Sequence, residues 1–210
     1  MLKFACVSAV ALVAFAAQAD IIRLDTSAFS AGVGGEFTAT PLSGNVGLTG
    51  LAGDLSGGSF QTFCMEYDEH FRPGNIFTVV LNTGAVGGDV PSGFDPLDPR
   101  TAYLYTLFRT GTLGIYNYGG SREDTARDLQ RAIWFIEDEN GGANNAFVAL
   151  ANAAVAPGGD WYGRGIGNVR VMNLYNENGT RAQDQLTLIP APGALALLGL
   201  AGLGAARRRR

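Results

Sequence analysis

The chain is poor in the residues on which many charge-driven and metal-dependent functions rely. Its 210 residues include one His, two Cys and 15 Lys+Arg against 19 Asp+Glu, a formal net charge of -4. This balance argues against nucleic acid as a partner, because nucleic-acid-binding proteins replace counterions with a cationic face. No ligand spacing typical of a structural zinc site or an EF-hand occurs, so we expect no metal.

Residues 1–19 have the pattern of a secretory signal peptide. Lys3 precedes an apolar run that begins at Phe4, and Ala17-Gln18-Ala19 places small residues before Asp20. The run is too short for a membrane-spanning helix and has the small-x-small end of a cleavage site. We therefore expect an exported protein from which residues 1–19 are removed.

The other end of the chain combines three features of a sorting tail. The 14 apolar residues 193–206 reach about 21 Å as a helix, which is short of a hydrocarbon core of about 30 Å. A proline motif precedes them and an arginine cluster follows: Pro190, Pro192, Arg207, Arg208, Arg209 and Arg210. Such a cluster favours the cytoplasmic side of a membrane.

This order of parts in residues 190–210 resembles the PEP-CTERM sorting signal of Gram-negative bacteria, with Ala191 where that family usually has Glu. The resemblance implies transient insertion of the tail into the inner membrane as a short transmembrane helix. It also implies processing by an exosortase-type membrane transpeptidase, and delivery to the cell surface or the exopolysaccharide matrix, as in a biofilm.

Residues 20–189 form the remaining domain, and they are markedly acidic. Lys3 and the four terminal arginines are outside it, so 10 cations stand against 19 acids, a balance of -9. The domain has no lysine and a single cysteine, Cys64. A lone cysteine in an exported protein is either a reactive or intermolecularly paired thiol or a buried small hydrophobe, and Cys64 by itself fits both.

The order of predicted elements is strands, then helices, then strands. We expect strands at 35–40, 60–67, 75–82, 169–176 and 184–189, and helices at about 99–110, 122–139 and 144–155. Asp98 before Pro99 predicts a helix cap, Ser121 and Asp124 a capping box, and 84–99 a loop. The sequence therefore predicts an α+β fold, an antiparallel β-sandwich or barrel with an inserted helical segment.

The second predicted helix contains the most informative pattern. Its apolar stripe is formed by Ala126, Leu129, Ile133 and Ile136. Gln130 and Trp134 lie one turn apart beside this stripe. A glutamine at the border of a core is costly unless its amide is hydrogen-bonded or chemically changed.

Two segments together resemble the signature motifs of bacterial surface thioester domains. The segments are Thr62-Phe63-Cys64-Met65-Glu66 and Leu129-Gln130-Arg131-Ala132-Ile133-Trp134, with Leu129 where Thr is typical. In that family a Cys sulfur and a Gln side-chain carbonyl join as an internal thioester. The resemblance implies a bond between Cys64 and Gln130, which needs no cofactor. The matching neighbours are Phe63, Met65, Glu66, Ala132, Ile133 and Trp134.

The resemblance implies a covalent adhesin or crosslinker, not a turnover enzyme. A lysine amine on a surface protein or matrix component would attack the Gln130 carbonyl, release Cys64 and leave an amide. The lack of lysine in residues 20–189 fits this chemistry, since arginine stays protonated. A plain compositional preference for arginine explains the same observation. Trp134 could shield the bond from water.

Two alternatives use the same residues without a thioester. Cys64 and His70 could form a nucleophile pair in a Cys-dependent hydrolase, but on an extended strand they would stand about 20 Å apart. The other alternative is a non-covalent structural or binding module of the matrix, in which Cys64 and Gln130 pack unlinked in the core.

Three further groups of residues have side chains of the types that bind ligands. Metal binding by Glu66, Asp68, Glu69 and His70 lacks a recognised spacing, and the acidic run is more typical of a solvated strand end. Asp95 and Asp98 flank a proline-rich loop that could bind calcium, although Asp98 is first a helix cap. Trp161 and Tyr162 could stack on sugar rings or close a small core.

Overall fold

The computed structural model describes residues 19–32, 34–87 and 92–191. The predicted signal peptide, except Ala19, and the tail from Pro192 onward therefore lie outside the described residues. Among those described, no helix is long and apolar enough to cross a membrane.

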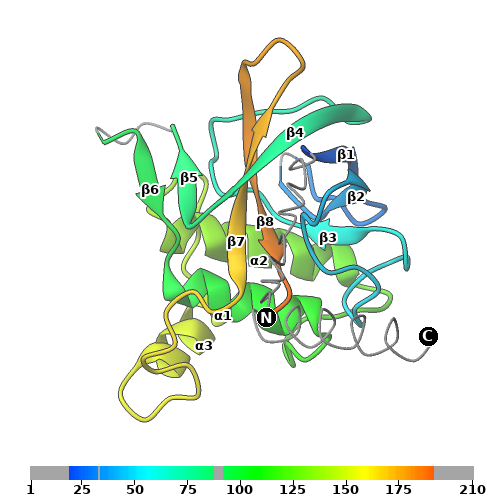
Figure 1. Cartoon of the computed structure of the whole chain (residues 1–210). Helices are drawn as coiled ribbons and strands as arrows, with labels where there is room; N and C mark the ends of the chain where they lie inside the picture. The colour runs from blue at the N-terminus through cyan, green and yellow to red at the C-terminus, as the bar shows by residue number, and fades with distance from the viewer. Residues whose placement is uncertain (1–18, 33, 88–91, 192–210) are drawn as a thin grey trace, which may run out of the picture.

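Six strands form one antiparallel sheet in the order β3-β2-β1-β4-β7-β8. They are β1 (Asp20–Thr26), β2 (Phe37–Ser43), β3 (Phe60–Thr62), β4 (Asn75–Asn82), β7 (Val169–Tyr175) and β8 (Arg181–Leu188). A short hairpin joins β5 (Gly84–Val86) to β6 (Phe94–Pro96). The larger sheet curls into a half-barrel (Figure 1).

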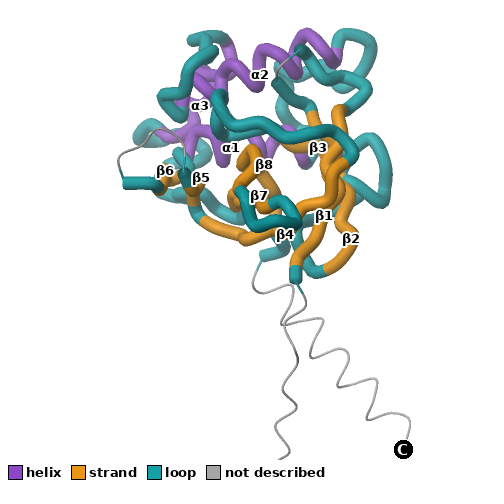
Figure 2. Tube along the Cα trace, turned by 90° about the horizontal axis from the view of Figure 1, so that it is seen from above, coloured by secondary structure: helices purple, strands orange, loops and turns teal. Residues whose placement is uncertain are grey.

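Three helices, α1 (Pro99–Arg109), α2 (Arg122–Ile136) and α3 (Ala146–Val155), lie between β6 and β7 in the described chain. Seen from above, they gather on one side of the molecule with the strands on the other (Figure 2). This arrangement confirms the predicted α+β class. The stripe predicted on α2 is buried at all four positions: Ala126, Leu129, Ile133 and Ile136.

The segment that follows β3 bridges the two edges of the curled sheet. The N–H of Leu186 donates to the carbonyl of Phe63 at 3.1 Å, and the N–H of Met65 donates to that of Asp184 at 3.0 Å. Cys64 lies between them, in an antiparallel bridge with Gln185. Phe63, Cys64 and Met65 thus form the closure segment of the barrel, which joins the β3 edge of the curled sheet to β8. The backbone is fixed on both sides of Cys64, so this connection sets the position of that residue.

Extended backbone in this segment sends alternate side chains into different parts of the core. Phe63 and Met65 pack in the cluster that contains the helix residues Leu129 and Ile133. Cys64 points into a second cluster, which includes Trp134, Phe37 and Met172. The lone cysteine is therefore wholly buried between the sheet and α2.

Several sequence-based boundaries were wrong for local reasons. The strand expected at 60–67 ends at Thr62, because the chain leaves β2 there and crosses to β8. The loop expected at 84–99 contains β5 and β6, and the first strand, β1, was not foreseen.

The two predicted caps had different outcomes. Asp98 accepts a hydrogen bond from the N–H of Arg100 at 2.7 Å, which confirms that cap. The capping box at Ser121 was wrong, because its side chain makes no cap hydrogen bond. Ser121 has φ -112° and ψ 33°, which is not the extended conformation that aims an N-cap side chain at the helix.

A buried ion pair ties the start of α2 to the residue before β2. Arg122 Nε donates to Glu36 at 2.6 Å, and another guanidinium nitrogen donates to Glu36 at 2.9 Å and to the Gly53 carbonyl at 2.6 Å. The hydroxyl of Tyr116 also donates to Glu36. Both charged side chains are at most 3% exposed. The pair holds the chain next to Gly35 against the helix that contains Gln130.

Removing one partner of this pair should destabilise the fold strongly, since it leaves a buried charge without its counterion. We expect Arg122→Met to lower the free energy of unfolding by about 3–5 kcal/mol. Asp25→Asn removes the exposed pair with Arg23, and should cost less than about 1 kcal/mol. Chemical denaturation monitored by circular dichroism compares the two. Equal losses would contradict a structural role for the buried pair.

Candidate functional site

Cys64 and Gln130 meet in the core although 66 residues separate them. Cys64 belongs to the closure segment of the barrel, and Gln130 lies in the second half of α2. The Cys64 Sγ lies 3.3 Å from Gln130 Oε1, and both residues are at most 1% exposed. The thiol thus donates a hydrogen bond to the amide oxygen, which is bonded directly to the carbon that a Cys64 nucleophile would attack.

The amide of Gln130 is fully engaged by backbone groups. Its Oε1 accepts hydrogen bonds from the N–H groups of Gly35 at 3.0 Å and Cys64 at 3.2 Å. Its Nε2 donates to the Cys64 carbonyl at 2.8 Å. This pattern fixes the orientation of the amide, because a flipped side chain would turn Nε2 toward two donors. Two N–H groups aimed at one carbonyl oxygen also form the geometry of an oxyanion hole.

The donor from Gly35 depends on a close approach that only glycine permits. A Cβ atom at Gly35 would lie 2.8 Å from Phe63 Cδ1 and 3.2 Å from Gln130 Oε1. At Gly34 it would lie 2.6 Å from Gln130 Cγ. The sequence analysis placed Gly35 at the start of the predicted strand 35–40 and gave neither glycine a role at the site. The available signal was the Gly34-Gly35 pair at the start of that predicted strand, because glycine in a strand often marks close contact of the backbone with another group.

The environment of Cys64 is not that of a hydrolytic nucleophile. Burial raises the pKa of its thiol well above the usual range, and a hydrogen bond with the backbone of Cys64 itself offsets this only in part. Enzymatic cysteine nucleophiles have the opposite shift. His70 is exposed, and its Nδ1 lies 3.1 Å from the Asp68 carbonyl oxygen. The extended strand on which Cys64 and His70 were compared does not form, since β3 ends at Thr62.

Two aromatic rings cover the contact on its outer side. Trp134 is 4% exposed and packs edge-on against Tyr67, with ring centroids 5.0 Å apart. The indole N–H is buried and makes no hydrogen bond of standard geometry among the described residues. The other motif residues Phe63, Ala132 and Ile133 are wholly buried and form the packing around the pair.

A pocket of about 440 Å³ borders the covered side of Gln130. Its walls include Gly34, Tyr67 and Trp134, together with Arg127 and Arg131 of α2. A small molecule or side chain in this pocket would lie against the residues that surround the Gln130 amide.

Three carboxylates cluster beside the site. Glu66, Asp95 and Glu139 each place an oxygen within 4.8 Å of the other two. Burial, and next the charge of Glu139, raise the pKa of Glu66 to about 8. Burial also raises the pKa of Asp95. The trio could offer oxygen ligands to a divalent cation, but at neutral pH a proton on Glu66 competes for the same position.

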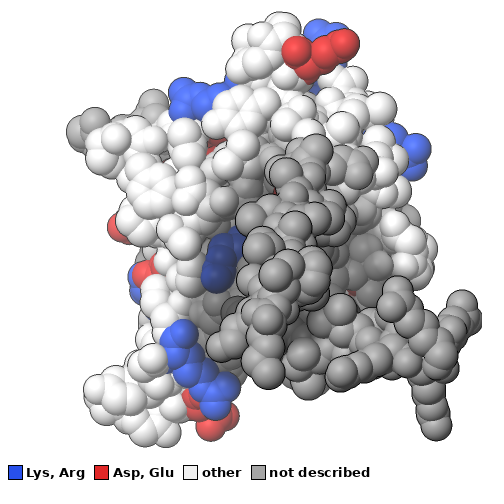
Figure 3. All heavy atoms as spheres, viewed as in Figure 1, with Lys and Arg blue, Asp and Glu red and all other residues white. Residues whose placement is uncertain are grey.

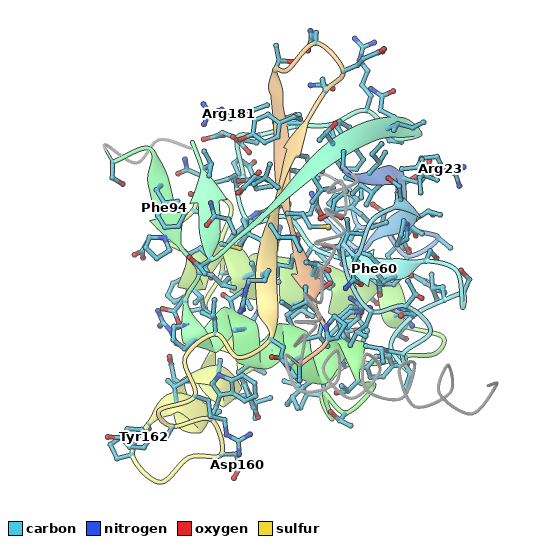
Figure 4. The ribbon with its side chains drawn as sticks, in the orientation of Figure 1. Arg23, Phe60, Phe94, Asp160, Tyr162 and Arg181 are labelled. Carbon is cyan, nitrogen blue, oxygen red and sulfur yellow. The ribbon has the colours of Figure 1, made fainter. Side chains whose placement is uncertain are left out.

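The remaining residues named from the sequence lie elsewhere. Asp98 caps α1 and pairs with Arg100, and the trio includes Asp95 but not Asp98. Trp161 packs against Tyr103, with ring centroids 5.7 Å apart, whereas Tyr162 is 60% exposed. Tyr162 lies at the tip of the loop after α3, far from Phe60 on β3 (Figure 4).

No protein-family model matches the chain, and neither a curated protein nor a solved structure is detectably similar to it. An interpretation of the site therefore depends on its geometry and on the sequence motifs.

The protonated state of Glu66 should make stability depend on pH. In the folded protein Glu66 keeps a proton that the unfolded chain releases above about pH 4.3. The contribution of Glu66 to the free energy of unfolding is therefore fully present at low pH and is lost as pH rises through about 8. Glu66→Gln keeps a neutral side chain throughout. We expect its melting temperature to exceed that of the wild type increasingly between pH 5 and 8.

The matched control for this pH series is Glu177→Gln, in the exposed turn after β7. Its melting temperature should follow the wild type at every pH. A constant difference between Glu66→Gln and the wild type would contradict a buried proton at Glu66.

Proposed function

We propose that this is an exported surface or matrix protein that forms an internal thioester between Cys64 and Gln130. It then uses that bond once, to attach itself covalently to an amine-bearing partner. One observation carries the proposal: the Cys64 thiol contacts the Gln130 amide while two backbone N–H groups hold the amide oxygen. The motif resemblance to surface thioester domains gives independent support.

Formation of the bond needs only groups that the chain supplies. The Cys64 sulfur adds to the Gln130 carbonyl carbon, and the N–H groups of Gly35 and Cys64 stabilise the negative charge on Oε1. The carbon–nitrogen bond then breaks, and the thiol proton leaves with the nitrogen as ammonia. Because burial keeps the thiol protonated, proton transfer accompanies attack and does not precede it. The fixed contact replaces a collision in solution.

Reaction with a partner reverses the roles of the two groups. The neutral amine attacks the same carbonyl carbon, the same N–H donors receive the developing charge, and the carbon–sulfur bond breaks. Cys64 regains a proton from the amine nitrogen, and Gln130 is left in an amide with the partner. No water or cofactor takes part, and each molecule reacts once. The protein is therefore proposed as a crosslinker and not as an enzyme.

The ends of the sequence support an extracellular setting for this chemistry. The signal peptide pattern of residues 1–19 provides for export, and the PEP-CTERM-like tail provides for sorting by an exosortase-type enzyme. The cell surface or extracellular matrix of a Gram-negative bacterium offers lysine amines on proteins. The absence of lysine from residues 20–189 limits attack by the domain on itself.

The thioester predicts a specific mass deficit. The purified protein should weigh one ammonia less than its calculated mass, whereas Cys64→Ala should have its full calculated mass. Methylamine should then react with the wild-type protein at the Gln130 carbonyl and remain attached as an amide. The same reaction frees the Cys64 thiol, which iodoacetamide then labels. A full wild-type mass with one titratable thiol after denaturation would leave the alternative, a non-covalent matrix module with the two residues unlinked.

The Gly35 donor predicts a second, independent effect. Gly35→Ala would force the chain away from Phe63 and Gln130, so the rate of ammonia loss, taken from the fraction reacted at early times after folding, should fall at least about tenfold, as for loss of an oxyanion donor. Gly57→Ala is the matched control, since a Cβ there meets nothing within 4 Å. Intact mass measures the fraction, and circular dichroism selects folded samples. If folded Gly35→Ala loses ammonia as completely and as fast as the wild type, the Gly35 N–H has no role in the mechanism.

A further inference from the structure

The pocket beside Gln130 has an unusual charge for this chain. Two arginines of α2, Arg127 and Arg131, line it, and no carboxylate is among its described lining residues. Residues 20–189 carry an excess of nine acids over cations. On the face drawn in Figure 3 the described surface is mainly uncharged, with a few separate groups of charged side chains. A local pair of cations next to the proposed electrophile is therefore a distinct feature.

The two arginines are not equivalent. Arg127 is engaged on the helix surface, 3.0 Å from Asp124 and 3.9 Å from Glu123. Arg131 is exposed, and its guanidinium makes no hydrogen bond or ion pair within the part of the chain that the structure describes. Arg131 also follows Gln130 directly. Its charge is thus available to a molecule that enters the pocket.

We propose that Arg131 selects the partner by pairing with a carboxylate that flanks the attacking lysine. This inference rests on the proposed thioester and names the class of substrate that it takes. A lysine approaches as an ammonium ion and releases its proton to solvent before it attacks, and without acidic neighbours that ammonium is repelled by Arg131. A flanking carboxylate removes that repulsion, and its two oxygens match the planar donors of a guanidinium. The aromatic walls of Tyr67 and Trp134 suit the apolar stem of the lysine.

A neighbouring pocket determines on which side of Tyr67 the carboxylate of the bound partner lies. It has a volume of about 310 Å³, shares Gly32 and Tyr67 with the first, and is lined by Asp68, Glu69 and His70. The acidic side of this second pocket disfavours a partner carboxylate. The partner's acid therefore pairs on the α2 side of Tyr67, where Arg131 lies, and not on the side of Asp68.

Capture of three synthetic peptides by the purified protein tests this selection. Each has blocked ends and one central lysine, flanked by two glutamates, two glutamines or two arginines. We expect the acidic peptide to be captured about three- to fivefold faster than the neutral one, the range of a rim charge pair, and the basic peptide to be slowest. Intact mass follows the adducts. Raised salt should reduce the preference.

Variants assign the preference to one side chain. Arg131→Gln should bring the ratio of acidic to neutral capture close to one, and Arg131→Glu should reverse it. Arg164→Gln is the matched control, because Arg164 lies over Trp161 in a different pocket, and it should keep the wild-type ratio. Equal capture of all three peptides by the wild type would overturn the proposal, as would an unchanged ratio in Arg131→Gln.

The same selection is measurable without the covalent step. In the Cys64→Ala protein, binding of the acidic and neutral peptides by calorimetry should differ in the same direction, and Arg131→Gln should remove the difference. A wild type that neither loses ammonia nor captures methylamine would end the thioester proposal alone. Equal peptide affinities in Cys64→Ala would end the proposed role of Arg131.

Discussion

The side-chain amide of Gln130 is the junction on which the centre of this molecule depends. Its oxygen receives N–H groups from Gly35 and Cys64, and its nitrogen donates to the Cys64 carbonyl. These groups come from the chain that enters β2, from the closure segment of the barrel and from α2. A buried amide without partners would be costly, so the three segments must meet there together. The arrangement that satisfies the amide also places the thiol against it.

Other interactions maintain this junction from a distance. Arg122, two turns before Gln130 on α2, binds Glu36 in the core and so holds the neighbouring Gly35. Backbone hydrogen bonds to β8 on both sides of Cys64 fix the sulfur's direction. Rigid elements therefore present each reacting group, which is what an uncatalysed bond formation between two poor reactants requires. Burial and the charge of Glu139 raise the pKa of Glu66 to about 8, so the carboxyl two residues after Cys64 holds a proton for much of the time at neutral pH.

The apolar cover and the cationic pocket have complementary roles in the proposed chemistry. Trp134 is buried and packs edge-on against Tyr67, and under the proposal these two rings keep water from the outer side of the Cys64–Gln130 contact. The pocket lined by these two rings, Gln130 and Arg131 is, under the proposal, where one class of molecule approaches the amide. An electrophile that must survive until it meets its partner needs both exclusion of water and selective entry.

The spacing of apolar residues and the positions of capping and turn residues determined the local structure. The α2 stripe, the Asp98 cap and the strand Asn75–Asn82 all follow from neighbours in the chain. Motif resemblance paired Cys64 with Gln130. Only the tertiary structure decided that β3 ends early so that Cys64 can cross to β8, and that Gly35 supplies a donor. It also decided that Arg131 lines a pocket. These features depend on hydrogen bonds and steric limits between segments distant in sequence, which no local pattern encodes.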